Sequence, residues 1–346
     1  MRPVVIVDGV RTPFIKSGTE FADVPARELG RAALRELIDR TAVDGGRLDE
    51  IIVGNVAGPA DATNIARVTA LLAGIPQRVP AVTVNRNCAS GIQSVADAAL
   101  RIGAGTAELI AAGGTESMSM VPVFYAESYK QKLFAKGRAR SAPARAAAAL
   151  KFRAADFKPV IALEVGLTDD TCGLNMGDTA EVLAREFGIT REAQDRFALQ
   201  SHERAMAARE QGRLDGEVLP FAVPPRFDRI VSRDNGPRAN QTLEALGKLK
   251  PYFDRKYGTV TVGNSCPVTD GAAMVLVASE EAAARLGRPV LGRIRSCVFA
   301  GLDPSRMGLG PAFAVPAALE KAGVQLADIE LIEFNEAFAA QVLANA

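Results

Sequence analysis

Residues 81–95 read AVTVNRNCASGIQSV and join a short β-branched segment to a run of small residues with helical periodicity. This change of period predicts a strand over 81–84, a sharp corner, and a helix behind it. Cys88 lies at the corner, near the N-terminus of the predicted helix. The helix dipole favours a thiolate there, and the thiolate is the form of cysteine that acts as a nucleophile. A buried structural cysteine is the alternative interpretation, because cysteine is often buried.

Strand and helix patterns alternate on both sides of this stretch. In the first part of the chain they fall at residues 4–8, 25–39, 51–53, 64–74, 81–84, 92–102 and 109–112. The alternation predicts βαβ units and a mostly parallel sheet, which is an α/β fold. It returns after residue 256, with strands predicted at 259–262, 274–277, 290–296 and 329–334 and a helix at 314–322.

Residues from about 117 to 253 interrupt this alternation, so we expect an inserted domain of helices and loops there. A long helix is predicted over 191–210, and His202 lies in it among charged residues. We therefore interpret His202 as a surface histidine rather than a catalytic one. Segment 130–158 is rich in Lys, Arg and Ala. A solvated helix or loop explains this run, and a docking face for a partner or for phosphates is the alternative.

One pattern occurs twice in the chain: a helix, then Leu-x-Asp, an apolar strand and Asn. It ends at Asn55 in the first copy and at Asn335 in the second. The repeat predicts a duplicated fold. Because the chain ends at Ala346, eleven residues after Asn335, we expect the second half to be incomplete.

Composition excludes several classes of function. The 41 Lys and Arg balance 40 Asp and Glu, and no nucleic-acid-binding motif is present, so nucleic acid is not an expected partner. No apolar run reaches transmembrane length, and the N-terminus lacks the apolar region of a signal peptide. The four cysteines are far apart in the sequence, which fits a reducing cytoplasm and neither a disulfide framework nor a zinc site. With His202 as the one histidine, no metal site is expected.

Five segments, taken in order, resemble those of the thiolases, which are acetyl-CoA acyltransferases. They are NCASG at 87–91, AGGTESM at 112–118, NMGDTAE at 175–181, GNSCPVTDGAA at 263–273 and NEAFAAQ at 335–341. The resemblance covers the whole chain. The stretch YFDRKYGTVT at 252–261 is most similar to the fatty-acid-oxidation branch, which includes the β-subunits of trifunctional complexes.

The resemblance implies a thiolase fold, with two similar βαβαβαββ halves packed in α-β-α-β-α layers. The first half would be residues 1–116, with its last strands resuming at about 254–280. A loop domain would occupy 117–253, and 281–346 would form an incomplete second half. The family also implies a homodimer or a dimer of dimers, and possibly a hydratase/dehydrogenase partner subunit.

The implied reaction is thiolytic cleavage of 3-ketoacyl-CoA by CoA, with CoA as a substrate and no cofactor. Cys88 would be the nucleophile, its backbone N–H would serve an oxyanion hole, and Asn335 would help to hold a water that stabilises a second oxyanion. The family places Met176 and Phe338 along the acyl and pantetheine channel, Ser265 and Cys266 at the pantetheine amide, and Arg238 near the CoA nucleotide. Core packing for Met176 and Phe338, a helix cap for Asn335 and an inert small core residue for Cys266 are the structural alternatives.

The sequence also departs from the family. Thiolases carry a Gly-His-Pro motif and a Cys-x-Gly-Gly-Gly or similar motif toward the C-terminus, and neither is present before Ala346. Two hypotheses follow. Either the chain is a truncated thiolase whose activity is in doubt, or it is a degenerate scaffold that binds CoA or a partner. A ketoacyl synthase is a rival enzyme on the same fold, and the Asn-Glu-Ala-Phe segment argues against it.

Overall fold

The computed structural model describes residues 2–346. Its centre is a mixed sheet with the strand order β11-β1-β10-β5-β3-β4, with β2 paired to β10. The strands are β1 (Val4–Arg11), β2 (Ile15–Lys16), β3 (Glu50–Gly54), β4 (Ala81–Val84), β5 (Leu109–Ser117), β10 (Thr269–Ser279) and β11 (Gly292–Arg293). Strand β3 runs parallel to β4 and β5, whereas β10 runs antiparallel to β5 and β1. The α/β class is confirmed, and the expectation of a mostly parallel sheet is corrected to a mixed one.

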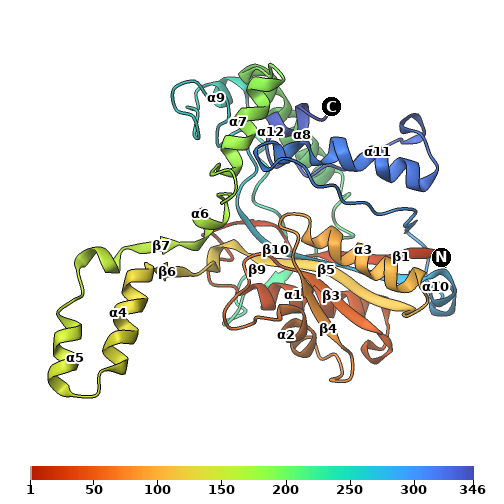
Figure 1. Cartoon of the computed structure of the whole chain (residues 1–346). Coiled ribbons are helices and arrows are strands. Elements are labelled where there is room, and N and C mark those ends of the chain that lie inside the picture. The colour runs from red at the N-terminus through yellow and green to blue at the C-terminus, as the bar shows by residue number, and fades with distance from the viewer. Residues whose placement is uncertain (1) are drawn as a thin grey trace.

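Helices cover both faces of this sheet (Figure 1). Helices α1 (Ala26–Thr41) and α2 (Ile65–Leu72) pack on one face and α3 (Ser90–Gly103) on the other. Fully buried side chains such as Leu29, Leu34 and Ile51 fill the α1 side, and Ile52, Ile102 and Ile110 fill the α3 side. Short helix α10 (Glu280–Leu286) follows β10. Cys88 therefore follows an edge strand and precedes the helix that covers one face.

Strand β5 is longer than the sequence pattern indicates. The glycines after Ala112 predict its end, yet it continues to Ser117 in register with β10. A Cβ atom on Gly113 would lie 2.0 Å from the carbonyl oxygen of Ala273. The glycine is thus required by the close approach of two paired strands rather than by a turn.

The inserted region divides into a protruding part and a packed part (Figure 1). The protruding part contains β6 (Val123–Tyr125), α4 (Glu127–Arg138), α5 (Ala142–Ala149), η3 (Ala154–Phe157) and β7 (Pro159–Ile161). The packed part, which we call the helical lobe, contains α6 (Ala162–Gly166), α7 (Met176–Glu186), α8 (Arg191–Glu210), α9 (Leu243–Gly247) and, from the C-terminal end, α12 (Ala339–Leu343). The inserted region also contains a small two-stranded ribbon, formed by β8 (Phe221–Ala222) and β9 (Ile230–Val231). Two short 3₁₀ turns complete the first 281 residues, η1 (Gly45–Arg47) and η2 (Met118–Met120).

Residues 288–346 contain η4 (Pro304–Leu309), α11 (Gly310–Ala322) and η5 (Leu326–Asp328) besides β11 and α12. The predicted helix at 314–322 is confirmed as part of α11. The strands predicted at 259–262 and 329–334 are wrong, and the one at 290–296 shrinks to β11. A strand needs a hydrogen-bonded neighbour, and Leu331 and Ile332 are exposed without one in residues 2–346. The described residues hold one large sheet, so no second sheet layer is formed in that part of the chain.

Candidate active site

The turn that carries Cys88 is built from its own polar side chains. Asn87 has a left-handed backbone, with φ of 46°, an uncommon conformation outside glycine that asparagine tolerates better than most residues. The Ser90 hydroxyl accepts from the backbone N–H of Arg86 at 2.9 Å and donates to the carbonyl of Asn87 at 2.6 Å. The backbone N–H of Asn87 donates to the Asn85 side chain at 2.9 Å. This turn presents Cys88 at the surface, just before Ala89, the N-cap of α3. A buried structural role for Cys88 is therefore excluded.

The first turn of α3 sits directly on the sheet. A Cβ on Gly54, the last residue of β3, would lie 2.4 Å from the backbone carbonyl carbon of Ser90. Ser94 of α3 donates to the carbonyl of Gly113 in β5 at 2.8 Å. Cys88 thus lies beyond the carboxyl ends of the parallel strands β3 and β4, where open α/β sheets place their ligands.

The two motifs predicted at 263–273 and 335–341 lie side by side. The backbone N–H of Cys266 donates to the carbonyl of Ala337, and the N–H of Ala339 donates to the carbonyl of Asn264, both at 2.9 Å. Ser265 and Phe338 form an isolated β-bridge. Asn335 is exposed at the edge of this paired segment. The hydroxyl of Ser265 donates to the carbonyl of Thr261 at 2.7 Å, so it presents oxygen lone pairs to any further partner.

Cys88 and Cys266 lie within electrostatic range of each other. The pKa of the Cys266 thiol is raised, first by the protein atoms that crowd it and then by negative charge on Cys88. Both residues nevertheless keep solvent-accessible surface. The raised pKa keeps the solvent-accessible thiol of Cys266 neutral near pH 7.

Buried carboxylates position the Cys266 loop. Glu181 is 1% exposed and accepts from the backbone N–H groups of Thr259 and Val260 at 2.8–3.0 Å. Asn264 donates to Asp195 at 3.0 Å and accepts from the N–H of Thr261 at 2.7 Å. These motif residues act through the backbone of the loop rather than on a ligand.

Met176 and Phe338 are brought together by an apolar cluster in the helical lobe. Phe338 is 8% exposed, and its ring lies edge-on to that of Phe253, with 6.0 Å between centroids. Met176 begins α7 and packs against the same cluster. A Cβ on Gly177 would lie 2.1 Å from the ring of Phe253, so the helix can approach this ring only with glycine there. The side chains of Asn175 and Asp178 form a capping box at the start of α7.

His202 is not the plain surface histidine that the sequence indicated. Together with Ser265, Cys266 and Glu336 it lines a depression of about 250 Å³. Its Nδ1 accepts from the backbone N–H of Arg238 at 3.3 Å. Partial burial, followed by the charges of Arg238 and Lys16, lowers the pKa of the imidazole. Sequence reasoning missed this placement because His202 and Cys266 are 64 residues apart in the chain.

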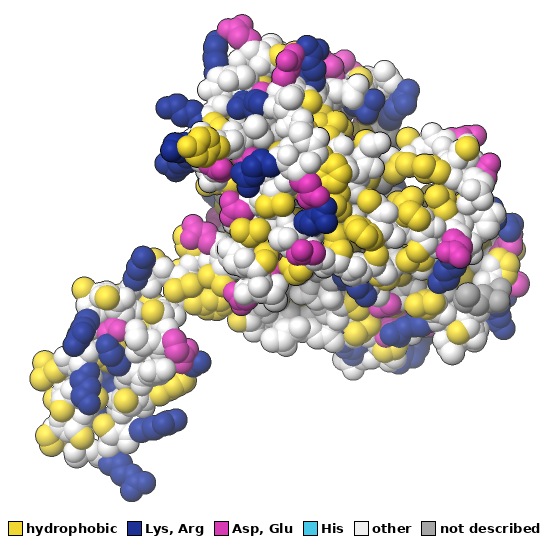
Figure 2. Space-filling model, turned by 45° about the horizontal axis from the view of Figure 1, so that its top comes forward, with side chains coloured by type: hydrophobic (Ala, Val, Ile, Leu, Met, Phe, Trp, Pro, Cys, Tyr) yellow, Lys and Arg dark blue, Asp and Glu magenta, His cyan; other side chains and the backbone are white. Residues whose placement is uncertain are grey.

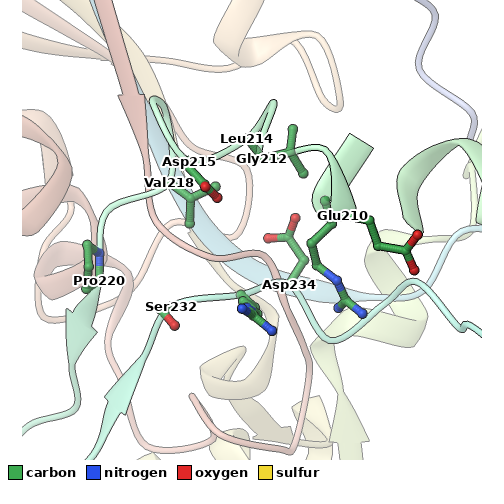
Figure 3. Close-up of a pocket in the computed structure, with 10 residues that line it drawn as sticks. Glu210, Gly212, Leu214, Asp215, Val218, Pro220, Ser232 and Asp234 are labelled. Atoms are coloured by element: carbon green, nitrogen blue, oxygen red, sulfur yellow. The ribbon is translucent and has the colours of Figure 1, made fainter. Parts of the chain in front are cut away.

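A larger depression of about 500 Å³ lies apart from these motifs, between the C-terminal end of α8 and the segment of Ser232 and Asp234 (Figure 3). Its carboxylate Asp234 is bound by the guanidinium of Arg11 at 2.8 and 3.0 Å and by the backbone N–H of Phe14 at 2.7 Å. These bonds tie the inserted region to β1. We therefore assign the chemistry to the Cys88 site rather than to this larger depression.

An exposed cysteine at the start of a helix, above the carboxyl ends of parallel strands, is an arrangement that suits an enzyme with a nucleophilic thiol. Comparison with known proteins agrees. Residues 4–281 match the thiolase N-terminal domain and residues 288–346 match the thiolase C-terminal domain. The chain belongs to the thiolase family and is an acyltransferase.

Individual relatives cover nearly all of the chain. It is 42% identical over 343 residues to proteins named 3-ketoacyl-CoA thiolase from Yersinia pestis (strain Pestoides F) and Yersinia pseudotuberculosis (serotype O:3, strain YPIII), covering 99% of this chain and 78% of each relative. The structure of an acetyl-CoA acetyltransferase from Bacillus anthracis matches with a TM-score of 0.90 and 37% identity, over 100% of this chain and 82% of that one. Human mitochondrial 3-ketoacyl-CoA thiolase matches with a TM-score of 0.88 and 38% identity, over 99% and 82%. The predicted thiolase fold is confirmed.

Proposed function

We propose that this acyltransferase cleaves 3-ketoacyl-CoA with CoA, giving acetyl-CoA and an acyl-CoA shortened by two carbons, as in fatty acid β-oxidation. The observation that carries the proposal is the turn that presents Cys88 at the start of α3. The names of the relatives at 42% identity support the choice of substrate.

The reaction balances with Cys88 as the only covalent carrier. The Cys88 thiol loses its proton and the thiolate attacks the 3-keto carbon. The C2–C3 bond breaks, and its electron pair leaves on the acetyl-CoA carbon, which takes up the proton that the thiol released. The acyl group stays on Cys88 as a thioester. The thiol of CoA then attacks this thioester, forms the new acyl-CoA, and returns the proton to Cys88.

The surrounding residues suit this sequence of steps. We assign oxyanion stabilisation to the backbone N–H of Cys88 and to a water held by Asn335. Met176 and Phe338 would flank the apolar chain. Ser265 would accept from a pantetheine amide, because its own proton is used on Thr261. Cys266 would face the acyl carbonyl as a neutral thiol, and Arg238 the CoA nucleotide.

We add His202 to this set as a CoA-binding residue. Its Nδ1 accepts a hydrogen bond from the backbone N–H of Arg238, so in the neutral ring Nε2 carries the hydrogen. A neutral imidazole fixed in this tautomer offers an N–H donor at Nε2 to a ligand in the depression that His202 lines together with Cys266.

The same hydrogen bond favours a second candidate function. With its Nδ1 lone pair engaged, His202 acts as a hydrogen-bond donor at Nε2 and is not placed to take the proton of Cys88. A scaffold that binds CoA or a partner without turnover is the alternative.

We also propose a cytoplasmic location and self-association as a dimer or dimer of dimers. The four cysteines are free thiols, as in a reducing compartment. Ile92 and Leu100 of α3 are 64% and 54% exposed, which offers apolar surface to a second copy. A hydratase/dehydrogenase subunit is a further partner suggested by the fatty-acid-oxidation branch.

Acetyl-CoA formation from a 3-ketoacyl-CoA and CoA tests the proposal. We expect Cys88→Ser to lower the rate by more than about 10³-fold, because the nucleophile carries the whole sequence of steps. Cys297→Ser, which alters a cysteine outside the site, is the matched control and should keep the rate. Equal rates for both variants would refute the proposal, and CoA binding without any acetyl-CoA formation would favour the scaffold.

A further inference from the structure

Glu116 is a partly buried carboxylate near the end of β5, outside the set of residues assigned to the reaction. The last residues that pair β3 with β5 are Gly54 and Gly114, and β5 continues beyond them along β10. Glu116 lies in this extension, beside residues 55–57, the loop into which β3 runs. It is thus placed at the carboxyl ends of the parallel strands, the same edge of the sheet that carries Cys88.

Both carboxylate oxygens of Glu116 hold this loop. One oxygen accepts from the side-chain amide of Asn55 at 3.0 Å, and the other accepts from the backbone N–H groups of Val56 at 2.8 Å and Ala57 at 3.2 Å. Asn55 is 4% exposed, and its amide also donates to the carbonyl of Thr115 at 2.8 Å. One side chain therefore fixes three successive residues of the loop.

The loop in turn contacts the turn that presents Cys88. The side-chain amide of Asn85 donates to the carbonyl of Val56 at 3.4 Å, and its oxygen accepts from the backbone N–H of Asn87 at 2.9 Å. Asn85 thus connects the loop that Glu116 holds to the left-handed residue that precedes Cys88. Three hydrogen-bonded steps join the carboxylate to this turn.

Two further contacts connect the start of the loop to the same turn. The backbone N–H of Asn55 donates at 3.1 Å to the carbonyl of Val84, the last residue of β4. Gly54, which precedes the loop, abuts the backbone of Ser90 so closely that a Cβ would have no space. A displacement of the loop therefore reaches the Cys88 turn from both of its sides.

The surroundings of Glu116 differ from those of the surface carboxylates. Figure 2 shows many acidic side chains, in magenta, at the surface, several of them beside dark blue Lys or Arg. Glu116 forms no such ion pair within residues 2–346, and Arg27, the cation that lines the same small hollow, is bonded to Asp61. Burial raises the pKa of the Glu116 carboxyl, and the hydrogen bonds of the loop oppose that shift. Amide groups alone thus hold this charge in place.

An ionised carboxylate suits this position because the three groups that face its oxygens are all hydrogen-bond donors. A carboxylate only accepts, whereas a glutamine side chain would turn an N–H group toward one of these donors. The change Glu116→Gln therefore removes the hold on the loop while it keeps the size of the side chain.

We propose that Glu116 is a positioning residue for the thiolysis: it holds the 55–57 loop and, through Asn85, keeps Cys88 at the start of α3. The inference rests on the proposed function only for the reaction that it affects, because the reactivity of the thiol is measurable without turnover. A purely stabilising role is the alternative. It would lower the free energy of unfolding and leave folded Cys88 as reactive as before.

Two readouts test the inference: the kcat and KM of acetyl-CoA formation, and the rate at which iodoacetamide alkylates Cys88, followed by peptide mapping. The whole chain is used in buffer without detergent. No helix in residues 2–346 is long and apolar enough to cross a membrane. In Glu116→Gln we expect kcat to fall about 10- to 100-fold with little change in the KM for CoA, because a nucleophile misplaced by about 1 Å loses that much. Alkylation should slow several-fold, because Cys88 leaves its place before the helix.

Asp49→Asn is the matched control. Asp49 lies at the opposite end of the same strands and accepts from the backbone N–H groups of Glu108 at 2.7 Å and Leu109 at 3.0 Å. It should keep both rates, and circular dichroism confirms that the variants are folded. Equal losses in Glu116→Gln and Asp49→Asn, or a Glu116→Gln variant that unfolds more easily but keeps both rates, would refute the inference.

Asn85→Ala breaks the last link without a change at the buried carboxylate, and because Asn85 is exposed this variant should fold. It should also slow alkylation, and the double variant should react no more slowly than the slower single one, because both changes act on one path. Losses that multiply in the double variant, or an Asn85→Ala variant that reacts like the parent, would refute the link. If the parent forms no acetyl-CoA while Glu116→Gln still slows alkylation, the inference holds and the proposed function alone fails.

Discussion

Asn87 and its left-handed backbone decide where the Cys88 thiol lies. The residue holds φ of 46° while Asn85 and Ser90 bind the backbone on both sides of it. A strained backbone conformation at a reactive side chain is a common feature of active sites. The local polar network thus orients the nucleophile, and the start of α3 supplies the electrostatic environment.

Asn87→Val tests this strain. A β-branched residue in the left-handed region costs about 1–2 kcal/mol, so we expect the free energy of unfolding to fall by that amount and acetyl-CoA formation to fall with it. Urea unfolding and the rate assay check the two effects. Asn87→Gly is the control and should keep most of the stability, because glycine adopts this conformation freely. A valine variant as stable and active as the parent would show that the turn does not constrain Cys88.

His202 offers a direct view of the same site because it is the only histidine in the chain. Its carbon-bound imidazole protons give one set of NMR signals, which can be followed as the pH changes. The titration should show a pKa below the ordinary value of 6.5, because the ring is partly buried and because Arg238 and Lys16 carry positive charge near it. The ring is therefore neutral over a wider pH range. Added CoA should shift these signals and change the apparent pKa.

We expect His202→Ala to weaken CoA binding about threefold to tenfold, the worth of one hydrogen bond. Calorimetry measures it, and His202→Gln should restore part of the affinity by offering an N–H donor. Signals that do not respond to CoA would remove His202 from the site.

At the scale of elements, the close packing of α3 on the sheet determines the position of Cys88. The helix begins where β3 and β5 carry glycine, and a side chain on Gly54 has no space beside Ser90. Because the neighbours are backbone atoms, they cannot turn aside as a flexible side chain would. Helix α3 must then shift, and Cys88 with it.

Gly54→Ala should therefore lower the free energy of unfolding by about 1–3 kcal/mol, the usual cost of overpacking, and should lower activity. Gly91→Ala is a matched control in the first turn of α3, where a Cβ meets nothing within 4 Å. It should raise stability by about 0.5–1 kcal/mol, because alanine is the better helix former. Thermal unfolding of both variants checks the pair, and equal effects would contradict the packing account.

Across the whole molecule, the sequence was informative wherever structure depends on neighbours in the chain. The strand, corner and helix around Cys88 and the helix within α11 were predicted from local periodicity. Segments 259–262 and 329–334 have the apolar pattern of strands but no strand partner in residues 2–346, and pairing is a long-range property that no local pattern reports. The C-terminal end of β5 was not predicted, because Gly113 allows a close approach to Ala273, which is 160 residues away in the chain.

The candidate site also combines residues that local motifs indicated with residues that only long-range packing brings there. The motif segments indicated Cys88, Ser265, Cys266 and Phe338, and the structure brings the Cys266 loop beside Phe338. His202 gave no such signal, and the motif at 175–181 contained Glu181 without indicating its role, because both roles depend on the packing of α7 and α8 against the Cys266 loop.

The central claim is that Cys88 carries the acyl group, and mass spectrometry of the intact chain after mixing with a 3-ketoacyl-CoA tests it most directly. The account predicts a mass increase equal to the shortened acyl group, located by peptide mapping on Cys88, removed by added CoA and absent in Cys88→Ser. An adduct on Cys266, Cys172 or Cys297 in place of Cys88, or one that persists when CoA is added, would contradict it.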